Sequence, residues 1–359
     1  KMKCLEAKNL DISYGKKQIV FGFNFKLEEC QIGCFLGPSG CGKTTVLRSI
    51  AGFEQPSKGE IILNGKKLNG FKTYITPEKR NIGMVFQEIS LFPHLSVEDN
   101  IQFGMRSWSR EKRKKRTHEL LELIGMSRFG KKYPHQLSGG QQQRIALARA
   151  MAPKPSLLLM DEPFSSLDAE LREQLAREVR LILKHENISA LLVTHDQNEA
   201  FAMGDDICVI NQGRVQQTDS AYNLYHNPKN RFVAEFIGEN NTFAGEVSDI
   251  SGGKCKVKLA NADILANPIS VKRKGERTTV SLRPERALIN PSDKMDNIHK
   301  GKIEEVIYHG DHTRVRINLL GNPEFILKVP NSSSNLDIKL GNEINIGWNS
   351  DDARALDPK

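Results

Sequence analysis

The most informative motif in this 359-residue chain is Gly37-Pro38-Ser39-Gly40-Cys41-Gly42-Lys43-Thr44. It matches the pattern G-x-x-x-x-G-K-[ST] at every position. A largely apolar run, residues 31–36, comes directly before it, and a segment with helical spacing, Lys43–Ala51, follows. A strand that passes through a glycine-rich turn into a helix is the context that the pattern requires. We name residues 37–44 the phosphate loop.

The residue types of the phosphate loop suit the binding of a nucleotide's phosphate groups. Its glycines let consecutive backbone N–H groups curl around phosphate oxygens, and the following helix points its positive end at the anion. We expect Lys43 to reach the β- and γ-phosphates, and the Thr44 hydroxyl to ligate Mg²⁺. The alternative is a plain glycine turn. The predicted nucleotide-binding residues of this region are Gly37, Pro38, Ser39, Gly40, Cys41, Gly42, Lys43, Thr44 and Thr45.

An apolar run that ends in two acids supplies the next candidates. Leu157–Met160 precede Asp161 and Glu162, which indicates a strand with carboxylates at its end. At a strand end beside the phosphate loop, Asp161 is placed to hold Mg²⁺ through water. Glu162, one position on, is the candidate general base for the attacking water. This motif is weak by itself and gains weight from the phosphate loop.

A second candidate anion site is Ser138-Gly139-Gly140-Gln141, ahead of a helical segment at residues 142–151. A hydroxyl at a helix N-cap, followed by glycines that leave backbone N–H groups bare, favours an anion. One chain does not need two γ-phosphate sites for one nucleotide. The residues alone therefore leave the purpose of this segment open.

Three further features stand in a set order with these motifs. Gln87 ends an apolar run, Ser165-Ser166-Leu167-Asp168 follows the two acids, and His195 follows another apolar run. In this order the set resembles the nucleotide-binding subunit of ATP-binding-cassette (ABC) transporters, over about residues 4–238. The resemblance implies an ATPase that uses ATP and Mg²⁺.

The resemblance also implies how two copies work together. Two subunits hold two ATP molecules head to tail, each between the phosphate loop of one chain and residues 138–141 of the other, with Asp168 at the seam. Tyr14 would stack on adenine and His195 would contact the γ-phosphate; core packing and an ordinary strand-end histidine are the alternatives. Gln87 would sense Mg²⁺ and the attacking water and couple to the membrane partner. The implied residues are Glu162, His195 and Gln87 for catalysis, Ser138, Gly139, Gly140, Gln141 and Asp168 for the partner's ATP, and Thr44, Gln87 and Asp161 for Mg²⁺.

The order of apolar runs predicts an α/β fold. Short runs at residues 156–160 and 190–194 alternate with helical patterns, which favours a mostly parallel sheet with helices on both faces. Between residues 88 and 152 helical spacing replaces the strand pattern, as in an inserted helical subdomain. With the resemblance, we expect a P-loop NTPase cassette of the ABC type in residues 1–238, which ends in a helix and linker at Tyr222–Phe236.

Residues 239–359 read as a second, smaller domain. Short alternating segments punctuated by Gly, Asn and Pro indicate a small all-β barrel or sandwich, and we expect an OB-like domain. Within it, Ser281-Leu282-Arg283-Pro284-Glu285 resembles the accessory domain of importer ATPases for sugars, sulfate, polyamines, thiamine and ferric iron. Residues 51–57, 133–144 and 236–241 look most like the ferric-iron importers. Iron is then cargo and not a cofactor, because the domain shows no His, Tyr and carboxylate cluster arranged for metal.

The resemblance implies the motor of an import system, with ferric iron as the expected solute and a polyamine, thiamine, sulfate or a sugar as alternatives. The expected partners are a second copy of the chain, transmembrane permease subunits and, indirectly, a solute-binding protein. The expected location is the cytoplasmic face of the bacterial inner membrane, as a peripheral subunit. A soluble ABC-type ATPase acting on nucleic acid or ribosomes is the alternative of another class. Such proteins usually carry a long coiled coil or two cassettes, so we expect no nucleic-acid partner.

Composition and charge limit the remaining classes. The chain carries 52 Lys and Arg residues against 43 Asp and Glu residues, a net charge of +9. Much of it lies in Arg106–Arg116, which holds seven Lys or Arg residues and the single acid Glu111. Ser109 is placed to cap a helix there, and we expect a solvated helix face, with contact to lipid head groups or a partner as the alternative. Plentiful apolar residues exclude a disordered chain. No stretch approaches the ~20 apolar residues that a membrane span requires. The six cysteines include no C-x-x-C pair, which predicts reduced thiols.

Overall fold

A computed structural model describes residues 3–70, 73–292, 294–331 and 338–358. The chain divides into two compact units, Lys1–Asn223 and Leu224–Lys359, which we name unit 1 and unit 2. The division falls earlier in the chain than the expected boundary at 238/239. Within the described residues, no helix combines the length and the apolar character needed to cross a bilayer. All six cysteines are unpaired, and five of them are buried.

Unit 1 is organised around a six-stranded sheet with the order β12-β11-β3-β10-β9-β8. Neighbouring strands run parallel except β11 and β12, which confirms the mostly parallel sheet. The three central strands are buried along nearly their whole length, as expected for a sheet covered on both faces. The strands are β3 (Ile32–Leu36), β8 (Ile82–Val85), β9 (Leu157–Asp161), β10 (Ala190–Thr194), β11 (Asp206–Asn211) and β12 (Arg214–Asp219).

Unit 1 also contains an antiparallel sheet, β2-β1-β4-β5, that the sequence pattern does not predict. Helix α1 (Lys43–Ala51) contacts β2 as well as β9 and β10, so it lies between the two sheets. The ring of Phe35 on β3 packs edge-on against Phe23 and Phe25 of β2, with centroids 5.3 and 4.9 Å away. The additional strands are β1 (Lys3–Tyr14), β2 (Lys17–Glu28), β4 (Lys58–Leu63) and β5 (Lys66–Lys67), beside the short pair β6 (Asn69–Gly70) and β7 (Thr73–Tyr74).

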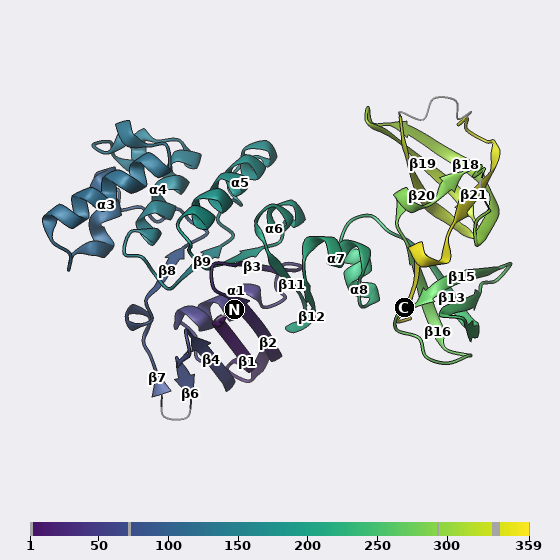
Figure 1. The fold of residues 1–359 in the computed structure, drawn as a ribbon, viewed down its shortest axis with the longest axis horizontal. Coiled ribbons are helices and arrows are strands. Elements are labelled where there is room, and N and C mark those ends of the chain that lie inside the picture. The colour runs from purple at the N-terminus through teal and green to yellow at the C-terminus, as the bar shows by residue number, and fades with distance from the viewer. Residues whose placement is uncertain (1–2, 71–72, 293, 332–337, 359) are drawn as a thin grey trace. The chain divides into compact units, whose positions relative to one another are not determined.

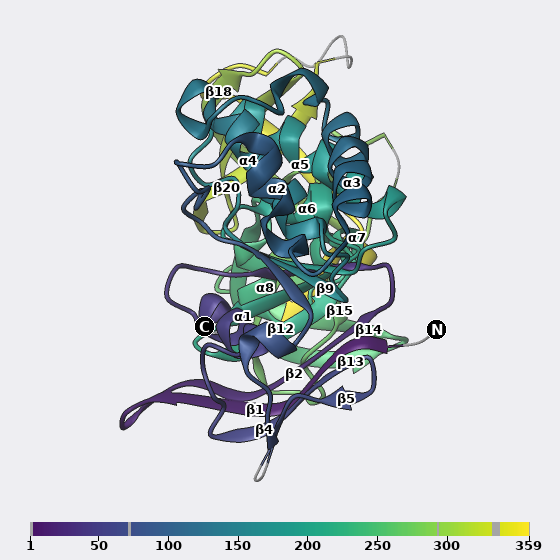
Figure 2. The ribbon, with the colours of Figure 1, turned by 90° about the vertical axis from the view of Figure 1, so that its left-hand side faces the viewer.

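Helices α5 (Ala169–His185) and α6 (Gln197–Met203) cover the face of the central sheet opposite α1, as Figure 1 shows. Residues 88–152 contain helices and no strand, which confirms the expected helical segment. These helices gather at the end of unit 1 that lies away from β1, β2 and β4 (Figures 1 and 2). They are α2 (Val97–Gln102), α3 (Arg110–Leu123) and α4 (Gly139–Met151), with 3₁₀ turns at Phe103–Met105, Ser127–Phe129 and Pro134–Gln136; another 3₁₀ turn, Pro77–Lys79, precedes β8.

The basic run Arg106–Arg116 is only partly the solvated face that its charge predicts. Ser109 caps α3 as expected, its hydroxyl accepting from the Lys112 N–H at 3.4 Å. Arg116, however, is buried, and its Nη2 lies 2.6 Å from Glu186 Oε2 just beyond α5. The run therefore contributes one internal ion pair between the helical segment and α5. Its exposed cations are Arg106, Arg110, Lys112, Lys114 and Lys115.

Unit 2 confirms the all-β expectation. Five strands close a barrel in the order β13-β14-β15-β22-β16, and five more form a sheet in the order β17-β21-β18-β19-β20. Trp348, Phe243 and Phe325 pack together in their shared core. The elements are α7 (Ala221–His226), which begins at the end of unit 1, α8 (Arg231–Phe236), β13 (Asn241–Ser251), β14 (Lys254–Lys258), β15 (Asp263–Pro268), β16 (Arg277–Leu282), β17 (Leu288–Ile289), β18 (Asn297–Tyr308), β19 (His312–Leu319), β20 (Asn322–Pro330), β21 (Glu343–Trp348) and β22 (Ala353–Leu356), with 3₁₀ turns at Pro284–Arg286 and Ser350–Asp352.

Arg283 gives the 281–285 motif a structural role inside unit 2. Its buried guanidinium donates to the carbonyls of Tyr225, Ala234 and Glu239 at 2.9–3.2 Å and lies over the Tyr225 ring, 4.2 Å from its centroid. The Tyr225 hydroxyl in turn donates to Glu285 Oε1 at 2.9 Å. Burial lowers the pKa of Arg283. These bonds hold the α7–α8 segment on the barrel, which explains why residues from Leu224 onward belong to unit 2.

Candidate functional site

The phosphate loop joins β3 to α1, and its backbone requires glycine at two points. Gly42 is the N-cap of α1 with φ 102°, a conformation that residues with a side chain rarely adopt. A Cβ at Gly37 would lie 2.1 Å from the carbonyl oxygen of Ile210 on β11. The loop thus passes directly over the neighbouring strand and turns into the helix, so that the N-terminus of α1 faces the space that the loop surrounds.

Lys43 already lies inside the loop. Its side chain is buried, and Nζ donates to the carbonyl oxygens of Gly37 and Pro38, both at 2.8 Å. The same nitrogen is 3.7 Å from Cys41 Sγ. Burial raises the pKa of the Cys41 thiol, although the Lys43 charge acts in the opposite direction. An anion bound in the loop would replace these two carbonyl oxygens as the hydrogen-bond partner of the Lys43 ammonium group.

Thr44 and Asp161 meet at the first turn of α1. The Thr44 hydroxyl donates to Asp161 Oδ1 at 3.0 Å, so a hydroxyl and a carboxylate oxygen converge beside the phosphate loop. Burial raises the pKa of Asp161, while the bond from Thr44 lowers it. Hard oxygen ligands of this kind suit Mg²⁺. Gln87 follows β8, whose Val85 pairs with Met160 of β9, and is exposed at the same edge of the sheet.

Glu162 and His195 come from neighbouring parallel strands. Val193 of β10 pairs with Asp161 of β9, and the Glu162 N–H donates to the Val193 carbonyl at 2.9 Å. His195 Nδ1 consequently lies 3.2 Å from Glu162 Oε2. Glu162 has φ 43°, in the left-handed region, and such strain in a residue with a side chain is concentrated at functional sites.

Residues 138–141 begin α4 in the helical segment, where Ser138 and Gln141 form a capping box. The Ser138 hydroxyl accepts from the Gln141 N–H at 3.4 Å, and Gln141 Oε1 accepts from the Ser138 N–H at 3.0 Å. A Cβ at Gly140 would lie 3.7 Å from Leu171 Cδ2, so this helix start lies next to the start of α5. Ser138, Gly140, Gln141 and Leu171 line a shared hollow of about 240 Å³.

Asp168 and Tyr14 have local environments that the sequence leaves open. Asp168 is the N-cap of α5, because its Oδ1 accepts from the Leu171 N–H at 3.0 Å. Tyr14 ends β1 at the hairpin and is 46% exposed, so core packing does not explain it. Both side chains are accessible from outside the chain.

A cluster around Arg172 on α5 is absent from the sequence prediction. Its guanidinium binds Asp196 and lies 3.5 Å from buried Glu199, both just after His195. The spacing of the two acids after His195 offers a signal for helix capping only. Nothing in the sequence pairs them with an arginine more than twenty positions earlier.

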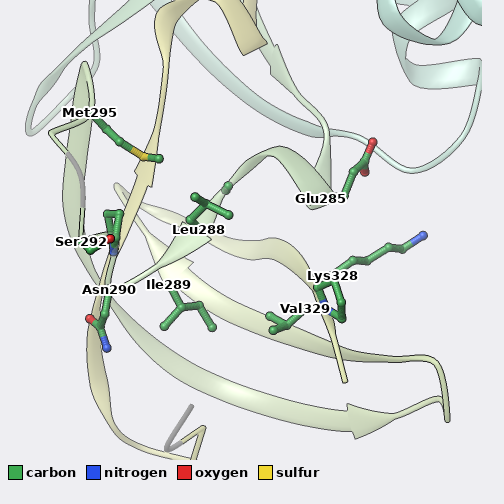
Figure 3. A pocket seen from close by; sticks show the side chains of 11 residues that line it. Glu285, Leu288, Ile289, Asn290, Ser292, Met295, Lys328 and Val329 are labelled. Carbon is green, nitrogen blue, oxygen red and sulfur yellow. The ribbon is translucent and has the colours of Figure 1, made fainter. Parts of the chain in front are cut away.

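Unit 2 has a separate cavity of about 440 Å³, shown in Figure 3. Leu288, Ile289 and Val329 line it, with Ile289 and Val329 facing one another. Lys328 at its rim is paired with Glu239, at 2.6 Å. Among the residues that the structure describes, no group of three or more His, Cys, Asp or Glu side chains is arranged to hold a metal ion.

Comparison with known proteins gives this geometry a family. A family model described as "ABC transporter" matches residues 20–165, and one described as "TOBE domain" matches residues 280–356. A spermidine/putrescine import ATP-binding protein of Trichodesmium erythraeum is 38% identical over 348 residues, which cover 94% of this chain and 90% of that protein. The chain belongs to the ABC transporter family of ATP-binding proteins. The ABC resemblance, the cassette fold with a β-rich domain, and ATP hydrolysis as the activity are thereby confirmed.

Two further relatives bear on this ABC ATPase. An Fe(3+) ions import ATP-binding protein of Haemophilus influenzae is also 38% identical, over 88% of each chain. The solved structure of cbiO1 from Clostridium perfringens, described as part of the ABC transporter complex cbiONQ, superposes with a TM-score of 0.58 at 26% identity. It covers 61% of this chain and 89% of that chain. The relatives therefore do not specifically support ferric iron as the solute, and the spermidine/putrescine proteins among them fit the polyamine alternative better.

Proposed function

We propose that this ABC ATPase is the motor of an importer for a small cationic solute, with a polyamine as the first candidate. The observation that carries the ATP-site assignment is the contact of Glu162 with His195 next to the Thr44–Asp161 pair. The polyamine assignment rests on the spermidine/putrescine relatives, which align over nearly the whole chain. Ferric iron is the second candidate because of the Haemophilus influenzae relative.

The residues of the site divide the reaction among them. Lys43 exchanges its two loop carbonyls for oxygens of the β- and γ-phosphates and neutralises their charge. Glu162 accepts the proton of the attacking water, and His195, whose Nδ1 lies 3.2 Å from that carboxylate, orients it and contacts the γ-phosphate. Mg²⁺, held by Thr44 and Asp161 with Gln87 at the rim, would supply further charge neutralisation. Tyr14 stacks on the adenine.

A second copy of the chain completes the site in this proposal. Residues 138–141 begin a helix of the helical segment, whereas the phosphate loop begins α1 between the two sheets. A head-to-tail dimer brings residues 138–141 and Asp168 of one copy to the ATP bound by the other. ATP binding closes this dimer, and hydrolysis reopens it. The helical segment passes the motion to permease subunits on the cytoplasmic face of the membrane.

The test is reconstitution with a permease and a solute-binding protein that co-purify with this chain. We expect the ATPase rate of the complex in liposomes to rise when the binding protein carries spermidine or putrescine. A rise with Fe³⁺-loaded protein and none with polyamines would replace the polyamine by ferric iron. Salt-sensitive stimulation of the isolated chain by DNA or ribosomes, with none by the membrane complex, would overturn import in favour of a nucleic-acid function.

A further inference from the structure

The guanidinium of Arg172, in the first turns of α5, binds two segments that flank the proposed catalytic centre. Nη2 donates to the Leu167 carbonyl at 2.9 Å, and Nη1 donates to Asp196 Oδ2, also at 2.9 Å. Nε lies 3.5 Å from Glu199 Oε1. One planar group thus joins the 165–168 segment, which follows Glu162, to the residues that follow His195. A hollow of about 310 Å³ opens beside it.

The acids that Arg172 binds hold the backbone on both sides of His195. The Thr194 hydroxyl donates to Glu199 Oε2 at 2.6 Å, and the same hydroxyl accepts from the Asp196 N–H at 3.0 Å. Asp196 Oδ1 accepts from the N–H groups of Asn198 and Glu199 at 2.7 and 3.2 Å and so starts α6. Thr194 and Glu199 are buried, which limits their alternative conformations.

We propose that Arg172 is a positioning residue that sets His195 against Glu162 and ties this arrangement to the 165–168 segment. His195 itself is exposed and only its neighbours in the chain are fixed, so its placement depends on Asp196 and Thr194. The inference rests on the proposed function, in which His195 and Glu162 act at the γ-phosphate. It adds a route by which a shift of the 165–168 segment, whose Asp168 lies at the proposed dimer seam, moves His195.

Replacing Arg172 separates positioning from ATP binding. In R172Q we expect kcat to fall about 10- to 100-fold, because small misplacements of reacting groups cost rates of this size. The dissociation constant for ATP, which depends on the phosphate loop, should stay within about twofold. R172K should resemble R172Q, since an ammonium group cannot make the same planar set of bonds. Weakened ATP binding with unchanged kcat would overturn the inference.

Arg180 is the matched control, because it lies two turns later on the same helix. Its Nη2 is 2.7 Å from Asp205 Oδ1, and it also donates to the Met203 carbonyl at the far end of α6. R180Q removes comparable bonds between α5 and its neighbours without touching Thr194 or Asp196. We expect R180Q to lower the melting temperature and to keep kcat within about twofold. An equal loss of kcat in R180Q and R172Q would reduce Arg172 to a structural role.

A double-mutant cycle with His195→Ala distinguishes failure of this inference from failure of the proposed function. Single-turnover hydrolysis is measured for the wild type, R172Q, H195A and the double variant. If Arg172 acts through His195, R172Q should slow the H195A protein by less than about twofold. A loss that adds in full to that of H195A would overturn the role of Arg172 alone. Near-normal turnover in H195A would instead overturn the role of His195 in the proposed function, and with it the route through Arg172.

Discussion

His195 Nδ1 lies 3.2 Å from Glu162 Oε2, across the C-terminal ends of the neighbouring parallel strands β10 and β9. A backbone hydrogen bond fixes the two strand ends relative to each other, because the Glu162 N–H donates to the carbonyl oxygen of Val193, two residues before His195. The two residues are more than thirty positions apart in the chain, and parallel pairing alone brings them together. In the proposed function, this carboxylate is the general base for the attacking water and the imidazole is the group that orients it.

Alkylation of Cys41 should abolish ATP binding, because a group added to Sγ occupies the loop beside Lys43. Burial raises the pKa of this thiol, so its thiolate fraction is small at neutral pH and the reaction should quicken as pH rises. Saturating ATP should slow the modification. Mass spectrometry and nucleotide binding, followed in parallel, check this.

Exposed Cys30 provides the internal control, since it should react first and without effect on ATP binding. Cys41→Ser should bind ATP and resist inactivation by the reagent. Modification of Cys41 that leaves ATP affinity unchanged would contradict the assignment of the phosphate loop.

Neutralising the exposed part of the basic run should leave ATP binding intact. In a variant with Arg110, Lys112, Lys114 and Lys115 changed to Gln, we expect unchanged ATP affinity and at most weaker association with membranes. Nucleotide titration and vesicle sedimentation measure the two properties. Loss of ATP affinity would show that this helix contributes to the nucleotide site.

Arg116 should behave differently from its neighbours in that run. R116Q leaves Glu186 without its buried partner, and breaking a buried ion pair costs about 3 kcal/mol. We therefore expect a lower free energy of unfolding in R116Q, measured by denaturant titration. Lys115→Gln, one position earlier and exposed, is the control and should be neutral. Equal stability of the two variants would contradict the structural role of Arg116.

Arg283 should be essential to the stability of unit 2. R283Q leaves the carbonyls of Tyr225, Ala234 and Glu239 without their donor, at a cost of about 3 kcal/mol. Near-ultraviolet circular dichroism of Trp348 and the unfolding midpoint report the loss. Arg286→Gln, in the adjoining 3₁₀ turn, removes a half-exposed ion pair with Asp352 and should change stability little. A neutral R283Q would contradict this account of the 281–285 motif.

The local parts of the site were predictable because the residues that form them are consecutive in the sequence. The phosphate loop needs glycines, Lys43 and Thr44 in one order, and Asp161 is forced to the end of a strand by the apolar run before it. Parallel pairing of such strands then brings Thr44 to Asp161. The helical segment was predictable for a similar reason, because the spacing of its apolar residues changes from every second residue to nearly every fourth.

Contacts between distant charged residues were not predictable. Arg116 belongs to a run of charged residues whose pattern predicts exposure to solvent. Its ion pair with Glu186 becomes visible only when α3 packs near the end of α5. From the sequence, Arg172 is an ordinary cation on an amphipathic helix. Its ion pair with Asp196 forms only because α6 packs beside α5. The antiparallel sheet was missed because its long strands carry register shifts that interrupt the alternation on which strand prediction depends.

The sharpest test of the proposed catalytic site is the ATPase rate of Glu162→Gln, measured together with its ATP-dependent dimerisation. We predict that E162Q binds ATP with normal affinity and accumulates as a closed dimer. Its hydrolysis should fall at least about 100-fold, because the general base is lost while the phosphate loop and residues 138–141 are unchanged. Near-normal turnover by E162Q would contradict the assignment of Glu162 as the base, and with it the catalytic centre built on Glu162 and His195.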